Sequence, residues 1–188
     1  MRGIFIGRFQ PIHRGHIEVI KHILNEVDEI IVLIAAAQLS HSMKNPLTGG
    51  ERMTIVRAAL EEENLPMDRI WIIPAQDVSD NSLWVYHLRR LSPSFDVMYS
   101  NNPFTLRLFQ ETGIKTKTIP MFDRAINSAT EIRLKIVNNG KLKGLLCSST
   151  IRFLNDWDIQ GRIVSIVSDD STSNASANLP GSEMNYEK

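Results

Sequence analysis

The chain of 188 residues is 43% hydrophobic, enough to bury one core, and its length favours a single domain. Lys plus Arg and Asp plus Glu each total 21, so no overall field favours nucleic acid or a membrane surface as a partner. Cys147 is the single cysteine, which excludes an intramolecular disulfide and a cysteine-rich zinc module. No apolar run approaches the roughly 18 residues of a membrane span, and we expect a cytoplasmic protein with a small-molecule partner.

The first elements alternate between strand and helix. Residues 4–6 form an apolar run typical of a buried strand, and apolar residues then recur at helical spacing over 17–27. Residues 29–37 are a continuous, largely β-branched and apolar run, typical of a strand covered on both faces in a parallel sheet. The sequence TGGE (48–51) has the spacing of a capping box, with Thr48 and Glu51 as its partners, and predicts a helix through residue 60.

The alternation continues to residue 120. The remaining predicted elements are a strand over 69–74, a helix over 83–91, a strand over 96–100, a helix capped by Asn102 with Pro103 at its first position and ended by Gly113, and a strand over 115–120. This pattern predicts an α/β fold with a doubly wound (Rossmann-like) parallel sheet of about five strands. In such a sheet, ligands bind beyond the carboxyl ends of the strands.

From about residue 128 the sequence becomes helical in character. The sequence SATE, which starts at Ser128, is a second capping box and heads a helix over 132–137, and residues 145–157 predict a further helix. We expect a single domain over 1–167 whose last part is a helical appendage. Residues 168–188 are rich in Ser, Asn and Asp, and we predict that they form a disordered tail.

The stretch GRFQPIHRGH follows the first strand and carries the strongest chemical pattern. His13 and His16 stand where the strand gives way to the first helix, whose N-terminal N–H groups and dipole attract phosphate. Gly7 and Gly15 permit close approach, and Arg8 supplies a donor that can contact two phosphate oxygens. The chain contains neither G-x-x-x-x-G-K-[ST] nor G-x-G-x-x-G. We therefore predict a polyphosphate site built from histidine and arginine.

This stretch resembles the histidine motif of the H-x-G-H nucleotidyltransferase superfamily, and five later blocks resemble archaeal-type nicotinamide-nucleotide adenylyltransferases in the same order. The blocks are AAAQLSHS (35–42), NPLTGGER (45–52), IIPAQDVSDNSLWV (72–85), YSNNP (99–103) and SATEIR (128–133). The resemblance covers roughly residues 1–133. It implies transfer of AMP from ATP to nicotinamide mononucleotide, which gives NAD and pyrophosphate.

The resemblance also implies roles for individual residues. The catalytic residues would be His13, His16 and Arg8; the ATP-binding residues Gly7, Arg8, His13, His16, Lys44, Ser128, Thr130 and Arg133; and the mononucleotide-binding residues Asp77, Asn81 and Trp84, with the Trp84 ring stacked on the nicotinamide. The attacking phosphate is already ionised, so positioning and charge stabilisation suffice for in-line attack on the α-phosphorus. Mg²⁺ would arrive with ATP, held by phosphates and water, and no protein metal site is expected.

Three positions depart from the family pattern. Lys44 replaces an arginine, which keeps the charge but loses bidentate geometry. Asn101 replaces a glycine, so the turn either keeps a negative φ or places Asn in the left-handed region. Leu134 stands where a further arginine is common, and from residue 140 the resemblance is weak. The resemblance implies a homo-oligomer, a hexamer in this family.

Structural roles compete with several of these assignments. His13 and His16 could hold a metal or cap the first helix, Trp84 could belong to the core, and Asp77 could cap a turn or helix. The other residues with ordinary structural interpretations are His41 and Ser42 in a solvated loop, Arg52 as an exposed helix residue, Thr48 and Glu51 as caps, His22 and His87 within helices, and Cys147 as a packed thiol.

Two other functions fit the histidine motif. A sister nucleotidyltransferase would act on another phosphate, such as flavin mononucleotide or phosphopantetheine, and would not need Trp84 with Asp77. A non-catalytic nucleotide sensor would explain the substitutions at Lys44, Asn101 and Leu134. No residue distinguishes nicotinamide from nicotinic acid mononucleotide.

Overall fold

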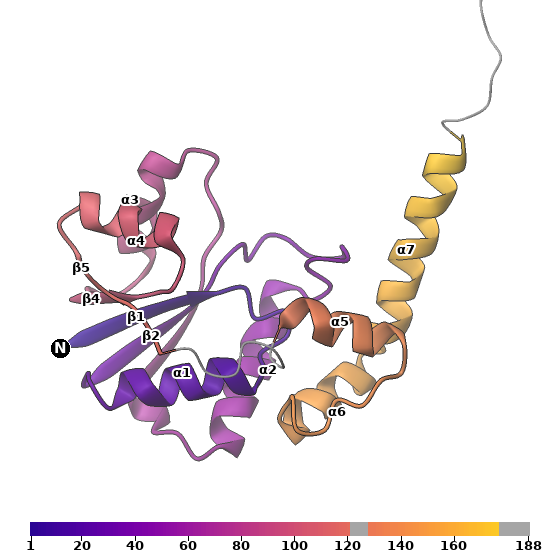
Figure 1. The fold of residues 1–188 in the computed structure, drawn as a ribbon, viewed down its shortest axis with the longest axis horizontal. Helices are drawn as coiled ribbons and strands as arrows, with labels where there is room; N and C mark the ends of the chain where they lie inside the picture. The colour runs from indigo at the N-terminus through magenta and orange to yellow at the C-terminus, as the bar shows by residue number, and fades with distance from the viewer. Residues whose placement is uncertain (121–127, 177–188) are drawn as a thin grey trace, which may run out of the picture.

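A computed structural model of the chain describes residues 1–120 and 128–176, with side chains through residue 168. Its centre is a parallel sheet of five strands: β1 (Arg2–Gly7), β2 (Glu29–Ile34), β3 (Ile70–Pro74), β4 (Val97–Tyr99) and β5 (Lys115–Lys117). The strand order is β3-β2-β1-β4-β5, and every neighbouring pair is parallel (Figure 1). The predicted doubly wound fold is confirmed.

Helices connect the strands and continue beyond them. The connecting helices are α1 (Arg14–Leu24), α2 (Gly49–Glu62), the short 3₁₀ helix η1 (Met67–Arg69), α3 (Asn81–Leu91) and α4 (Pro103–Glu111). The last three are α5 (Ala129–Val137), α6 (Ser148–Asp156) and α7 (Ile159–Ser176), which lie beyond the carboxyl ends of the strands, with α7 projecting outward (Figure 1). No helix in the described part of the chain is both long and apolar enough to cross a bilayer.

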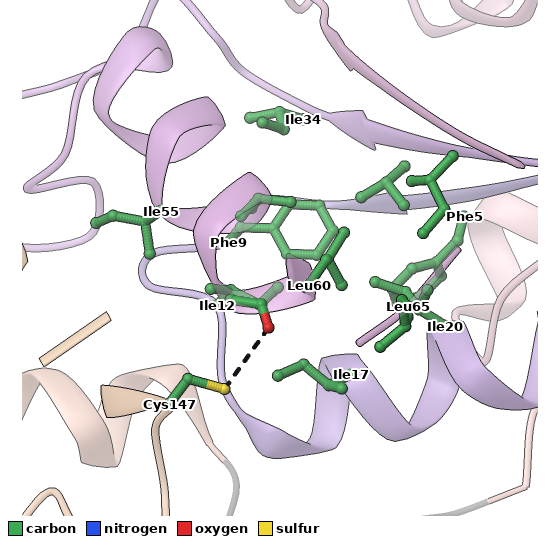
Figure 2. Packing of buried hydrophobic residues seen from close by; sticks show 14 of the residues in the cluster. Phe5, Phe9, Ile12, Ile17, Ile20, Ile34, Ile55, Leu60, Leu65 and Cys147 are labelled. Carbon is green, nitrogen blue, oxygen red and sulfur yellow. Dashed lines mark hydrogen bonds between the residues drawn. The ribbon is translucent and has the colours of Figure 1, made fainter. Parts of the chain in front are cut away.

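Alternate strand residues build a core on each face of the sheet. Phe5 and Val32 belong to the larger cluster, which α1, α2 and α6 cover, whereas Ile4 and Ile31 belong to the smaller cluster under α3 and α4. In Figure 2, Cys147 packs near Ile12 and Ile17 in the larger cluster. The C-terminal helices therefore share a core with the first half of the chain.

The strand order reverses between β1 and β4, which are neighbours although two strands separate them in sequence. The chain leaves β1 toward α1 on one face and leaves β4 toward α4 on the other. A crevice beyond the carboxyl ends of the strands at such a reversal is the usual ligand position in an open α/β sheet. The stretch that contains the two histidines starts there.

The predicted helix caps form as expected in α2 and α4. Thr48 Oγ1 accepts from the Glu51 backbone N–H over 3.2 Å, and the Glu51 carboxylate accepts from the Thr48 N–H over 2.8 Å. Asn102 caps α4, and Gly113 follows it at φ 77°. At α5, only the Ser128 hydroxyl makes its half of the predicted box, accepting from the Glu131 N–H over 3.5 Å.

The C-terminal boundaries differ from the sequence prediction. The helix predicted from residue 145 starts at Ser148, because the Glu62 carboxylate accepts the Ser148 and Ser149 backbone N–H groups over 2.9 and 2.7 Å. The tail predicted to be disordered from residue 168 is helical as far as Ser176, because α7 starts on the buried residue Ile159 and helix propagation is less costly than nucleation. Residues 177–188 lie outside the described residues.

Candidate active site

The loop after β1 is shaped by Phe9. Its backbone is left-handed at φ 48°, and its ring is buried over Gly7. A Cβ at Gly7 would lie 2.8 Å from the Phe9 ring. The sequence predicts that the missing side chain of Gly7 lets a ligand approach the backbone closely. In the structure the Phe9 ring fills that space, so the glycine is needed for the shape of the loop. Contact between Gly7 and ATP stays a prediction.

His13 and His16 form one stacked unit at the start of α1. Their ring centroids are 3.7 Å apart with 27° between the planes, and the buried His13 is the N-cap residue. The His13 backbone N–H donates to His16 Nδ1 over 3.3 Å. Because that nitrogen accepts, the proton of the neutral His16 ring is on Nε2. His13 Nδ1 is buried with no partner among the described residues.

Both rings are held in the neutral form. Burial lowers the pKa of His13 to about 4. Burial lowers the pKa of His16 well below its usual value, and the neighbouring His13 lowers it further. At pH 7 the pair therefore offers N–H donors and ring nitrogens, and not two positive charges. A buried ring nitrogen without a partner marks a position where a ligand can bind.

Arg133 of α5 reaches the loop that carries this pair. Its side chain is buried and donates from Nη1 to the Gln10 carbonyl and from Nη2 to Thr130 Oγ1, each over 3.1 Å. Its Nε is buried without a partner among the described residues. Burial and, secondarily, the charge of Arg8 lower the pKa of Arg133. The structure thus brings Thr130 and Arg133 to the loop of the histidine motif, while Ser128 caps α5.

Three amide side chains join the loops at this edge, and the sequence indicates this joining role for none of them. In each, the amide oxygen accepts from the backbone N–H of one distant residue and the amide nitrogen donates to the carbonyl of the same residue. The two distances, in that order, are 2.9 and 2.8 Å for Gln10 with Leu47, 3.0 and 3.5 Å for Gln38 with Asp77, and 2.9 and 2.8 Å for Asn101 with Ile119. Asn101 keeps a negative φ, so it meets the first of the two expected alternatives, and its paired bonds account for an amide in place of glycine.

Lys44 is exposed on the segment that precedes α2. The backbone of this segment is held by Gln10 at Leu47 and by Arg162 of α7, which donates to the Pro46 carbonyl over 3.0 Å. The neighbouring Asn45 is buried, and its Oδ1 has no partner among the described residues. Gln10 and Arg162 therefore anchor the segment just after Lys44, and the Lys44 side chain lies at the surface.

The interpretation of Arg52 as an exposed helix residue, one of the two alternatives, is wrong. Its side chain is fully buried, and burial lowers its pKa. Its guanidinium donates to the backbone carbonyls of Arg8, Ala35, Ala36, Leu39 and Thr48. Such a network joins residues far apart in sequence, and no local pattern around Arg52 indicates it.

The residues predicted to bind the mononucleotide line one pocket of about 230 Å³, together with Val78, Phe104, Thr105 and Leu108. Asp80, rather than Asp77, caps α3, accepting from the Ser82 N–H over 2.8 Å. Trp84 is half-buried and meets Phe109 edge-on at 5.8 Å. Trp84 thus contributes to the core and to the pocket wall. Val78 belongs to the block 72–85, whereas Phe104, Thr105 and Leu108 of α4 carry no sequence motif and join the pocket through the packing of α3 and α4.

Three further titratable residues, His22, His41 and Cys147, have surroundings that fit their structural interpretations. His22 lies 3.4 Å from the Glu26 carboxylate, and the exposed His41 lies 2.9 Å from the Ser40 hydroxyl. Burial raises the pKa of Cys147 to about 11, which keeps its thiol protonated. Over residues 1–120 and 128–168, no cluster of three His, Cys, Asp or Glu side chains is arranged for a metal ion.

The sequence of the chain matches a known family of proteins. The family model described as cytidylyltransferase-like matches residues 4–135, from β1 into α5. The chain belongs to the cytidylyltransferase-like family. The matched region contains His13, His16 and Arg133, whereas α6 and α7 lie outside it.

Two of the curated relatives of this chain share one name. The chain is 41% identical over 163 residues to the nicotinamide-nucleotide adenylyltransferase of Methanococcus aeolicus, covering 87% of this chain and 93% of that protein. It is also 41% identical to the enzyme of that name from Methanosarcina barkeri, over 92% of this chain and 98% of that protein. The alignments extend beyond the family model into the C-terminal helices.

A solved structure has the same fold. A bifunctional NMN adenylyltransferase/ADP ribose pyrophosphatase from Francisella tularensis, crystallised with AMP and an Mn ion, superposes with a TM-score of 0.74 at 21% identity. The match covers 96% of this chain and 56% of that one, so the chain spans about half the length of the bifunctional protein. At this identity the likeness concerns the fold.

Proposed function

We propose that the chain is a nicotinamide-nucleotide adenylyltransferase that transfers AMP from ATP to nicotinamide mononucleotide and releases pyrophosphate. The observation that carries the proposal is the stacked, neutral pair of His13 and His16 at the N-terminus of α1, with the unpartnered His13 Nδ1, and with the Arg133 guanidinium bonded to Gln10 in the same loop. Relatives about 40% identical over most of the chain, named for this activity, support it.

In this proposal, the chain contributes binding, orientation and charge stabilisation. The His16 Nε2–H and the N-terminal N–H groups of α1 donate to the triphosphate, while Arg8 and Arg133 balance its charge. Asp77, Asn81 and Trp84 hold the mononucleotide so that its phosphate oxygen lies in line with the α-phosphorus. That oxygen bonds to the phosphorus as the bond to pyrophosphate breaks, and no proton must be removed from the nucleophile.

A divalent ion fits this arrangement as a companion of the nucleotide. The donors around His13 are guanidinium and imidazole groups suited to phosphate, and the described residues form no three-ligand cluster. We propose Mg²⁺, carried by ATP, which would neutralise phosphate charge while Arg8, His16 and Arg133 contact the remaining oxygens. We also propose that the protein works in the cytoplasm. We further propose that it is a homo-oligomer, and light scattering after size exclusion would measure the molar mass that decides this.

The test is direct formation of NAD. The purified chain is incubated with ATP, Mg²⁺ and nicotinamide mononucleotide, and NAD is measured with a coupled alcohol dehydrogenase while pyrophosphate is measured separately. Equal amounts of both products are expected. Parallel reactions contain nicotinic acid mononucleotide, flavin mononucleotide or phosphopantetheine as acceptor. Turnover only with one of the last two would identify a sister enzyme, and ATP binding without any turnover would identify a sensor.

A further inference from the structure

Arg52 is a fully buried arginine whose five hydrogen-bond partners are all backbone carbonyls. We propose that Arg52 is a positioning residue that sets the loop carrying Arg8 and the loop holding Asp77 relative to each other, and thereby aligns the two substrates. The proposal rests on the adenylyltransferase function and adds to it a residue that contacts neither substrate.

The first connection runs from Arg52 to the histidine-motif loop. Arg52 Nη1 donates to the Arg8 carbonyl over 3.1 Å and to the Ala35 carbonyl over 2.8 Å. Arg8 follows β1 and Ala35 follows β2, so one nitrogen joins the ends of two neighbouring strands. The backbone of Arg8 is thus fixed, although its side chain is exposed.

The second connection runs toward the mononucleotide pocket. Arg52 Nη2 donates to the Ala36 carbonyl over 2.9 Å and to the Leu39 carbonyl over 3.4 Å. Between these two residues lies Gln38, whose side chain pairs with the Asp77 backbone. The constraint on the loop after β2 is therefore passed to the loop after β3, where Asp77 lines the pocket.

The loop after β2 is held in a conformation that needs support. Ala36 has φ 50°, in the left-handed region that residues with a Cβ rarely adopt. Its neighbours along the chain are Ala35 and Ala37. The loop is also pressed against α2, since a Cβ at Gly49 would lie 2.8 Å from the Ala37 oxygen. The hydrogen bonds from Arg52 on either side of this turn offset its conformational cost.

Only a guanidinium can make these contacts. The carbonyls lie in different directions around a planar group with several fixed N–H donors, whereas a lysine ammonium would reach one or two of them. Carbonyls that lose their donor in a buried loop are costly to leave unpaired, so the loop would shift to find new partners. Arg52→Lys therefore keeps the positive charge and removes the geometry.

The chain offers a matched control in Arg69. Its guanidinium also donates to three backbone carbonyls, those of Leu24, Val27 and Asp28, but at the amino ends of the strands. Arg69→Lys removes bonds of the same kind at the opposite edge of the sheet. A loss of kcat that reflects stability alone would be common to both variants, whereas a loss of kcat through positioning would be confined to Arg52→Lys.

The experiment measures kinetics and local hydrogen exchange at a temperature where both variants are folded by circular dichroism. We expect Arg52→Lys to lower kcat by about 10²-fold with both substrates saturating, as small misplacements of reacting groups do. Amide exchange in residues 35–39 and 75–78 should rise at least about tenfold. Arg69→Lys should keep the kcat and the exchange of those segments. Wild-type kcat and exchange in Arg52→Lys would overturn the proposal.

A second variant covers the case in which Arg52→Lys does not fold. Gln38→Met removes the paired contact with Asp77 from an exposed position, and it should raise KM for the mononucleotide while leaving ATP affinity unchanged. An unchanged KM would overturn the second connection. If the wild-type protein makes no NAD, the proposed function fails, but exchange in residues 35–39 and 75–78 still decides whether Arg52 joins the loops.

Discussion

The Arg133 guanidinium donates to the Gln10 backbone carbonyl over 3.1 Å, although 123 positions separate the two residues. The bond joins α5 to the histidine-motif loop, and Gln10 in turn pairs with Leu47 on the segment of Lys44. Gln10 therefore connects the three stretches assigned to ATP. Both the oxygen and the nitrogen of its side-chain amide are bonded to Leu47, so we expect Gln10 to organise the site without binding the nucleotide.

Arg133→Lys should weaken ATP binding. Lysine keeps the charge but cannot hold Gln10 and Thr130 while a further nitrogen faces the phosphates. Because hydrogen bonds to a charged group contribute about 1.5–3 kcal/mol, we expect the Kd of ATP to rise about 10- to 100-fold. Calorimetry with a non-hydrolysable analogue measures it. Arg152→Lys, on the exposed surface of α6, should bind normally, and an unchanged Kd for Arg133→Lys would refute the role.

His16→Ala should lower kcat more than it raises KM. The variant removes the Nε2–H donor that the His13 N–H···Nδ1 bond orients, and loss of one donor to developing charge typically costs about 10²-fold or more in kcat. His16→Gln, which retains one acceptor and one donor, should recover part of the loss. A change confined to KM would show that His16 only binds the ground state.

The neutral His13 makes stability depend on pH. Its pKa is about 4 in the folded protein and about 6.5 when unfolded, so the unfolded chain takes up the proton first as pH falls. The free energy of unfolding should therefore decrease from about pH 6.5 down to about pH 4, by at most about 3 kcal/mol for this group, and not further below.

Urea unfolding of the free protein between pH 7 and pH 4 measures this dependence. His13→Gln should reduce the slope of the curve and leave the contribution of His16, while His41→Gln, which changes an exposed histidine, should keep the wild-type slope. If both variants lose stability with the wild-type slope, the titration of His13 does not contribute.

Trp84→Leu should weaken mononucleotide binding selectively. An indole face over a pyridinium contributes roughly 0.5–2 kcal/mol, so the Kd should rise about 2- to 30-fold with ATP binding unchanged. Trp84 also packs on Phe109. Phe95→Leu is the control, because the Phe95 ring lies 6.1 Å from the Phe109 ring, centroid to centroid, but does not line the pocket. Equal losses in both variants would assign Trp84 to the core alone.

Much of the fold was predictable because its determinants are local. Strand and helix periodicity identified β1 to β5 and the helices between them, and side chains within three residues of each other formed the caps at Thr48 and Asn102. The end of the C-terminal helix was not predictable in this way. It depends on helix propagation from residues buried against the rest of the molecule, such as Ile159 and Ile163.

By itself, the sequence determined the doubly wound sheet and the position of the histidine motif at the end of the first strand, since both follow from patterns within short stretches. Only the tertiary structure decided the roles of Arg52, Gln10, Gln38 and Asn101, whose polar groups pair with backbone atoms of distant segments. Such pairings are necessary because a buried donor needs an acceptor, and which acceptor lies within reach is settled by the packing of the loops.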